Sequence, residues 1–145
     1  MNSDTPLYIL DTSIVVKWYS SDREADLDKA HDIFDELLQG FIDVIVPDLL
    51  IYELSNSLLK SKKLSDIEIN EIIERFYSYL LSIKEVNSTR IKFANELAYQ
   101  HEITTYDAIY LSLAKEFSAP LVSSNPRHHK SISQIQVINL TEWKG

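Results

Sequence analysis

Four oxygen-bearing side chains stand at points along the chain where a folded sheet could gather them. Asp11 and Asn125 each follow a short apolar run, while Glu53 and Asp107 lie in largely apolar helical stretches. Carboxylate and carboxamide oxygens are hard ligands that suit Mg²⁺ or Mn²⁺, and neither histidine nor cysteine is needed. A divalent ion held by these side chains could activate water and offset negative charge on a phosphodiester.

Each of these residues also has an ordinary structural interpretation. Asp11 could cap or close the turn after its strand, and Asn125 could be a turn residue before a proline. Most glutamates on helices are solvated, but the apolar neighbours of Glu53 place it near a buried boundary, where a carboxylate needs a partner. Thr104 and Asp107 match a helix-capping arrangement. The combination, more than any single residue, indicates a metal site.

The elements that must position these residues follow from the spacing of apolar side chains. We expect strands at 7–10, 44–46, 121–122 and 137–138, with a further brief strand within 84–87. We expect helices within 14–19, 26–41, 48–59, 65–83, 91–98 and 106–117. This alternation predicts the α/β class, a three-layer α/β/α sandwich around a mostly parallel sheet of four to five short strands. In such sheets, ligands bind beyond the carboxyl ends of the strands, where the strand order switches.

Particular side chains indicate where some helices begin and end. Ser65 and Glu68 form a capping box, and Asp48 is expected to cap the helix that carries Glu53. Gly40 suits the end of the helix that precedes it.

Composition limits the class of protein further. The 145 residues predict a single domain spanning 1–145, and 14 basic against 22 acidic residues give a net charge of −8, contrary to a general nucleic-acid binder. The lack of cysteine excludes disulfides, a thiolate zinc site and a cysteine nucleophile, and two glycines exclude a glycine-rich phosphate loop. With neither a signal peptide nor a bilayer-length apolar segment in the sequence, we expect a soluble cytoplasmic protein with no membrane contact.

Basic side chains gather in two runs, at residues 60–63 and 127–130. The second run contains adjacent histidines, which do not share a face in a strand or a helix and so make a weak metal-ligand pair. We expect a solvated loop there. Both runs could flank an acidic groove and contact phosphates.

Four motifs, in this order and spacing, resemble those of PIN-domain proteins, above all the toxin ribonucleases of VapBC-type toxin–antitoxin pairs. The resemblance extends over nearly the whole chain. The motifs are Leu10-Asp11-Thr12-Ser13 with Val16-Lys17-Trp18, the stretch 47–53 with Asn56 and Leu58, the stretch 105–111 with Leu113 and Ala114, and the stretch 120–125.

The resemblance implies a role for each matched residue. Asp11, Glu53 and Asp107 match the family's metal-binding acidic residues, which would hold Mg²⁺ or Mn²⁺. Asn125 stands where the family's fourth motif usually carries an aspartate, so it offers an oxygen donor without a negative charge. Divalent affinity should fall, which affects two-metal occupancy more than the binding of a single ion.

Five further residues are expected to position substrate. Thr12 and Ser13 match hydroxyl residues beside the first aspartate, and Asn56, Ser123 and Arg127 are assigned the same role. The resemblance also implies a parallel sheet flanked by helices, a homodimer, a cognate antitoxin protein and the cleavage of tRNA, rRNA or mRNA.

Three functions compete at this point. The leading hypothesis is a metal-dependent endoribonuclease, the toxin of a toxin–antitoxin pair. The second is a weakened PIN module that binds RNA or a partner without cutting, because Asn125 replaces an acidic residue. The third is a phosphotransferase with Asp11 as nucleophile, which Ser13 disfavours because such sites carry a second aspartate at that position. Apolar residues on the helices within 48–59 and 65–83 fit either ordinary core packing or a dimer or antitoxin surface.

Overall fold

A parallel sheet forms the centre of the computed structural model, which describes residues 4–125 and 132–144. The strand order in the described residues is β3-β2-β1-β4-β5, and each pair of neighbours is parallel. The strands are β1 (Leu7–Leu10), β2 (Asp43–Pro47), β3 (Ser82–Lys84), β4 (Leu121–Ser123) and β5 (Val137–Asn139).

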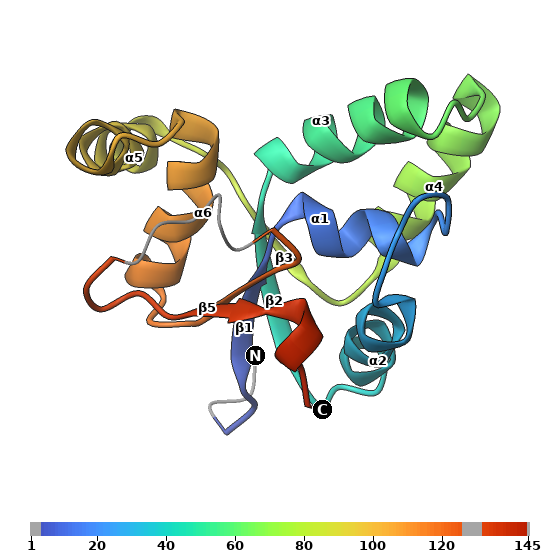
Figure 1. Cartoon of the computed structure of the whole chain (residues 1–145), viewed down its shortest axis with the longest axis horizontal. Coiled ribbons are helices and arrows are strands. Elements are labelled where there is room, and N and C mark those ends of the chain that lie inside the picture. The colour runs from blue at the N-terminus through green and yellow to red at the C-terminus, as the bar shows by residue number, and fades with distance from the viewer. Residues whose placement is uncertain (1–3, 126–131, 145) are drawn as a thin grey trace.

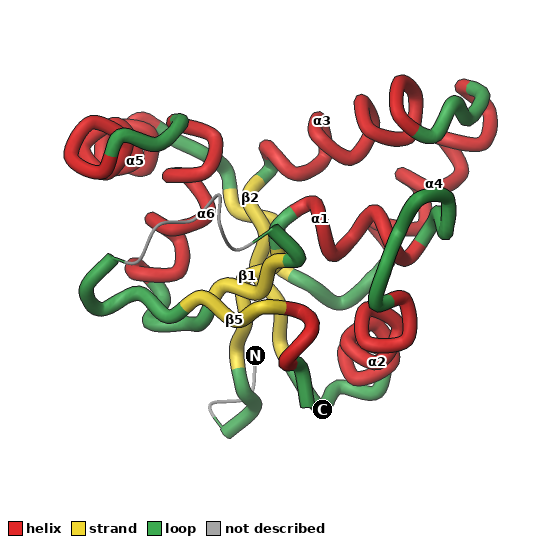
Figure 2. Tube along the Cα trace, viewed as in Figure 1, coloured by secondary structure: helices red, strands yellow, loops and turns green. Residues whose placement is uncertain are grey.

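Helices cover both faces of this sheet (Figure 1). They are α1 (Thr12–Val15), α2 (Leu27–Leu38), α3 (Leu49–Asn56), α4 (Asp66–Ser78), α5 (Ser88–His101) and α6 (Thr105–Glu116). The helices α5 and α6 lie on one side, and α1 to α4 lie on the other. Figure 2 shows the strands in yellow between these two layers. The predicted three-layer α/β/α sandwich with a parallel sheet is therefore confirmed.

The central strands β1 and β2 are largely apolar without alternation because both of their faces are covered. Ile9 and Leu10 on β1 and Val44 to Val46 on β2 are almost fully buried. On one face they meet α6, whose residues 108–114 are all buried. The helix α5 packs on α6, and Arg90 joins the two through paired hydrogen bonds to the Glu116 carboxylate of 2.9 and 3.0 Å.

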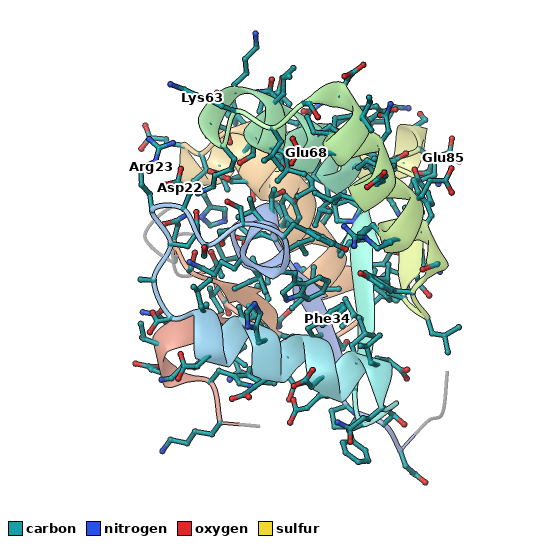
Figure 3. The ribbon with its side chains drawn as sticks, turned by 90° about the vertical axis from the view of Figure 1, so that its right-hand side faces the viewer. Asp22, Arg23, Phe34, Lys63, Glu68 and Glu85 are labelled. Atoms are coloured by element: carbon teal, nitrogen blue, oxygen red, sulfur yellow. The ribbon has the colours of Figure 1, made fainter. Side chains whose placement is uncertain are left out.

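An aromatic cluster joins α2 to the 3₁₀ turn Val16–Trp18 and to the end of α4. The Phe34 ring lies 4.8 Å from the Trp18 ring and 5.1 Å from the Tyr79 ring, measured between centroids. Figure 3 shows Phe34 on α2. The Trp18 indole also donates a hydrogen bond to the Ala30 carbonyl at 2.9 Å. This cluster fixes α2 against the segment that follows α1.

Some predicted helix ends are confirmed and others are wrong. Ser65 and Glu68 form the capping box of α4. The helix stops at Ser78 because the backbone of Tyr79 is extended, so the predicted continuation to residue 83 is wrong and β3 begins at Ser82 instead of within 84–87. Gly40, with a φ of +77°, stands just beyond the end of α2.

Asp48 does not cap α3. Its backbone is already helical, with φ −61° and ψ −23°, so its side chain makes no capping hydrogen bond. Its carboxylate instead accepts a hydrogen bond from the Val86 backbone N–H at 3.2 Å. Asp48 therefore joins the end of β2 to the segment after β3. After α3, a π-helical stretch, Ser57–Ser61, continues the same helical path.

Across residues 4–125 and 132–144, no helix combines the length and the apolar character needed to cross a bilayer.

Candidate active site

The strand order switches direction around β1, and the candidate site lies there. The strands β2 and β3, which come next in the sequence, lie on one side of β1, and the later strands β4 and β5 lie on its other side. The carboxyl ends of β1 and β4 therefore leave the crevice in which open α/β sheets bind ligands. Asp11 directly follows β1, and Asn125 comes two residues after β4.

Side chains from four segments converge on a pocket of about 130 Å³ at this point. Its lining combines the four predicted acidic and amide residues with two predicted hydroxyl residues and one tyrosine. They are Asp11, Thr12, Ser13, Glu53, Asp107, Tyr110 and Asn125. The structure thus brings together residues more than a hundred positions apart in the sequence.

Asp11 is 7% exposed and is oriented by its own turn. One carboxylate oxygen accepts hydrogen bonds from the Ser13 backbone N–H at 3.0 Å and from the Ser13 hydroxyl. The Ser13 oxygen in turn accepts a hydrogen bond from the Ser124 backbone N–H at 3.0 Å. Ser13 therefore connects the end of β1 to the end of β4, and it fixes Asp11 as an N-cap of α1 at the same time.

Glu53 is held by two hydroxyl groups. Its Oε1 atom accepts hydrogen bonds from Thr12 Oγ1 at 2.9 Å and from Tyr110 Oη at 2.5 Å, and the two hydroxyls are themselves 2.9 Å apart. Burial, and then the negative charge of Glu53, raise the pKa of the Tyr110 phenol well above its ordinary value. Tyr110 is therefore protonated and acts as a hydrogen-bond donor to Glu53.

Asp107 has two roles that the sequence presented as alternatives. Its backbone N–H donates to the Thr104 hydroxyl at 3.1 Å, so Thr104 caps α6 as expected. Its carboxylate, in the first turn of the same helix, lines the pocket. Asn125 is exposed, and its backbone N–H donates to the Ser123 hydroxyl at 3.0 Å.

Two of the remaining predicted positioning residues, Asn56 and Ser123, do not line this pocket. Asn56 is exposed and lines a separate hollow with Tyr52 and Ile69, away from the carboxylates. Ser123 is fully buried and supports Asn125 through the hydrogen bond just described. Arg127, with the rest of the basic run 127–130, lies outside the described residues.

The donor chemistry of the pocket suits a hard divalent cation, since its acidic groups are all carboxylates and hydroxyl and amide oxygens accompany them. Within the described part of the chain, however, no three Asp, Glu or His side chains are close enough together to hold an ion. Hydrogen bonds hold Asp11 and Glu53 separately, as expected for like charges that repel one another.

Sequence reasoning assigned no role to Tyr110, although a signal was present. Residues 108–114 of α6 are all buried, so the phenol of Tyr110 needs a polar partner. It stands three residues after Asp107, and side chains at that spacing share a helix face. A buried tyrosine one turn beyond a predicted metal ligand therefore indicates a hydrogen-bonding role in the site.

A doubly wound parallel sheet with a carboxylate pocket at its switch point defines the class of this protein as an α/β ligand-binding fold. The sequence pattern of the PIN domain matches residues 8–133, and the chain belongs to that family.

Individual relatives agree with this assignment. Ribonuclease VapC3 of Pyrobaculum aerophilum is 30% identical over 80 residues, which cover 52% of this chain and 61% of that protein. The fold is also similar to that of a chain in the crystal structure of VapBC2 from Rickettsia felis, bound to promoter DNA, with a TM-score of 0.71 at 21% identity. The alignment covers 95% of this chain and 99% of the Rickettsia felis chain. Mycobacterium tuberculosis VapC20, a toxin that cleaves the sarcin-ricin loop, has a TM-score of 0.66 at 13% identity over 79% of this chain and 86% of that one.

Proposed function

We propose that the protein is a divalent-metal-dependent endoribonuclease that hydrolyses RNA phosphodiesters and acts as the toxin of a toxin–antitoxin pair. One observation carries the proposal: Asp11, Glu53 and Asp107 line a single pocket at the switch point of a PIN-family sheet. The partial likeness to a VapC ribonuclease supports the same reaction. We infer that the protein works in the cytoplasm, where it would meet its RNA substrate.

Asp11, Glu53 and Asp107 are the residues that would hold Mg²⁺ or Mn²⁺, with Asn125 adding a neutral oxygen. The three carboxylates lie too far apart to share an ion as they stand, so the charge of a bound ion would have to draw them together. When bound, the ion would lower the pKa of water and offset negative charge on the phosphodiester. Thr12 and Tyr110 orient Glu53 for this task, and Ser13 orients Asp11. The tyrosine cannot act as a base in this site because its pKa is raised, so its contribution is a fixed hydrogen bond.

The metal requirement gives the direct test of this proposal. Purified protein should cleave RNA when Mg²⁺ or Mn²⁺ is present and should stop when EDTA removes the ion, because the carboxylates alone cannot activate water. Gel analysis of end-labelled RNA measures this. Cleavage that continues unchanged in EDTA would contradict the proposal.

The second candidate is a PIN module that binds RNA or a partner without cutting, and Asn125 is the observation that favours it. Its neutral side chain lines the pocket where the family carries an aspartate, so the site has one negative charge less. Calorimetry with Mn²⁺ separates the candidates. Measurable Mn²⁺ binding supports the nuclease, whereas no detectable Mn²⁺ binding favours the PIN module that binds without cutting.

We also infer a cognate antitoxin and a homodimer. Large apolar side chains are exposed on α3, on the stretch after it and on α4, among them Tyr52 at 71%, Leu59 at 47% and Ile67 at 68%. Exposed apolar groups that lie this close along the chain are typical of a protein interface. Light scattering should give a mass near twice 16.8 kDa, and a mass near 16.8 kDa would reject the dimer.

A further inference from the structure

A second cavity opens beside the carboxylate pocket and is more than three times larger. It has a volume of about 470 Å³, and it shares Thr12, Ser13 and Asn125 with the pocket of about 130 Å³. Its other walls come from the turn after α1, from residues 23–26 and from the start of the π-helical stretch at Ser57. The two spaces therefore adjoin at the end of β1.

The volumes of the pocket and the cavity fit ligands of different size. Since a water molecule takes about 30 Å³ of liquid, the smaller pocket has room for an ion with a few waters or phosphate oxygens. The larger cavity falls within the range of about 300–1,000 Å³ that is typical of sites for small organic ligands. A ligand group of nucleotide size thus fits beside the carboxylates but not among them.

A network of buried charges fixes one wall of the larger cavity. Lys17, 5% exposed, donates hydrogen bonds to Glu24 at 2.8 Å and to the Ala25 carbonyl at 2.7 Å. Lys62 donates to the other Glu24 oxygen at 2.6 Å. These contacts attach residues 23–26 both to the turn after α1 and to the end of the π-helical stretch. The wall is therefore preformed, which reduces the entropy lost when a ligand binds.

The charged side chains that line this cavity balance one another, although the net charge of the whole chain is −8. Lys17 and Arg23 stand against Glu24 and Asp26, and Lys17 and Lys62 both bind the Glu24 carboxylate. Figure 3 places Arg23 beside Asp22 at one edge of the molecule, and its side chain is 68% exposed. A guanidinium in this position can reach a phosphate that approaches from solvent.

We propose that this cavity binds the nucleotide next to the cleaved phosphodiester of an RNA strand. In this subsite Arg23 contacts the phosphate that flanks the nucleotide, and the Ser57 hydroxyl hydrogen-bonds to its base. The inference rests on the proposed ribonuclease function and names how that site selects its substrate. The RNA backbone thereby runs from the carboxylate pocket, across Thr12 and Ser13, towards Arg23.

Binding can be measured apart from cleavage. An Asp107→Asn background prevents cutting, and fluorescence anisotropy with a labelled single-stranded RNA hexamer gives the dissociation constant. Adding Arg23→Ala should weaken binding about tenfold, as expected for a lost hydrogen bond to a charged group. Lys92→Ala is the matched control, because Lys92 is an exposed cation on α5 that does not line the cavity.

Ser57→Ala tests base recognition in the same background. It should narrow the differences in affinity among hexamers that differ only in the base next to the scissile position, while it leaves the affinity for the weakest of them unchanged. NMR titration of the background protein with a dinucleotide should shift the amide signals of Lys17, Ser57 and Ser124.

The outcomes distinguish this inference from the proposed function. If the wild-type protein cleaves RNA and the Arg23→Ala and Lys92→Ala variants bind RNA equally well, the proposed subsite is wrong and the proposed ribonuclease function is unaffected. Amide shifts confined to residues outside the cavity would do the same. A wild-type protein that cleaves no RNA would overturn the proposed function, and the subsite with it.

Discussion

At Glu53, one carboxylate oxygen accepts hydrogen bonds from two side chains that come from distant parts of the chain. Thr12 follows β1 and Tyr110 lies on α6, and both hydroxyls meet Glu53 Oε1. Partners of this kind hold a ligating carboxylate in the orientation that a metal requires, and their loss costs metal affinity. Tyr110 is only 3% exposed, so water cannot readily replace its hydroxyl.

The Tyr110→Phe variant should bind Mn²⁺ about tenfold more weakly while it keeps its fold, because it loses the hydroxyl and retains the ring. Calorimetry measures the affinity. Tyr106→Phe, on an exposed tyrosine of the same helix, is the control and should bind normally. In a Glu53→Gln background, Tyr110→Phe should have no further effect. Unchanged Mn²⁺ affinity in Tyr110→Phe would show that the tyrosine only packs.

Asn125 determines how many negative charges surround the proposed ion. Asn125→Asp should strengthen Mn²⁺ binding by about tenfold or more, since a fourth carboxylate adds a direct attraction to the cation. RNA cleavage should rise with it. The same change at Asn70, an exposed residue of α4 that lies outside the carboxylate pocket, should alter neither. A weaker or equal affinity in Asn125→Asp would mean that this side chain does not face the ion.

At the scale of residues, the sequence predicted the side chains that line the pocket. It did not predict the hydrogen-bond partners that hold those side chains in place. Asp11, Glu53, Asp107 and Asn125 could be found because each carries an oxygen donor at the edge of an apolar element. Local spacing indicates that Tyr110 needs a polar partner in the site, but it cannot identify Glu53 as that partner, because the two residues are 57 positions apart. The placement of Asn56 beside Ile69 of α4 also depends on how α3 and α4 pack.

At the scale of elements, the segment between α1 and α2 is fixed by the Lys17–Glu24–Lys62 network. Burial raises the pKa of the Glu24 carboxyl, but hydrogen bonds and charge attraction from both lysines outweigh it, so the net pKa lies below its ordinary value. The charged form of Glu24 is thus favoured by folding. Its contribution to stability is complete above the unfolded pKa and disappears as the pH falls through the folded pKa.

Glu24→Gln should lower the free energy of unfolding by about 3 kcal/mol at neutral pH, because Lys17 is then left buried without a counter-charge. The difference from wild type should shrink as the pH falls through the lowered pKa of folded Glu24, because Glu24 is then protonated in both the folded and the unfolded state. Urea unfolding at several pH values measures it. Glu71→Gln, an exposed change on α4, should be neutral, and a Glu24→Gln variant as stable as this control would contradict the network's role.

The end of a helix could be predicted from the sequence where neighbouring residues alone determine it. Ser65 and Glu68 mark the start of α4 through a capping box that involves neighbouring residues alone. Its end at Ser78 could not be predicted, because Leu80 and Ile83 continue the apolar spacing while Tyr79 is drawn into the ring cluster with Trp18 and Phe34. Asp48 likewise makes a tertiary contact in place of a cap.

At the scale of the whole molecule, the alternation of apolar runs and helices predicts a parallel sheet but not its order. That β1 lies between β2 and β4 decides that Asp11 and Asn125 meet, and this depends on pairings between strands far apart in the chain. The net charge of −8 also has a different meaning once the cations are located. The charges that line the larger cavity balance one another, and the exposed Arg23 beside it offers RNA a cation on an otherwise acidic protein.

The most direct test of the central claim compares RNA cleavage by the wild-type protein with that of Asp11→Asn and Asp107→Asn in the presence of Mg²⁺ or Mn²⁺. Asp35→Asn, an exposed change on α2, is the control that should cleave like wild type. Both pocket variants should lose cleavage while they remain folded, because each lacks a carboxylate that holds the ion. Equal cleavage by all four proteins would contradict the assignment of these carboxylates as the active site.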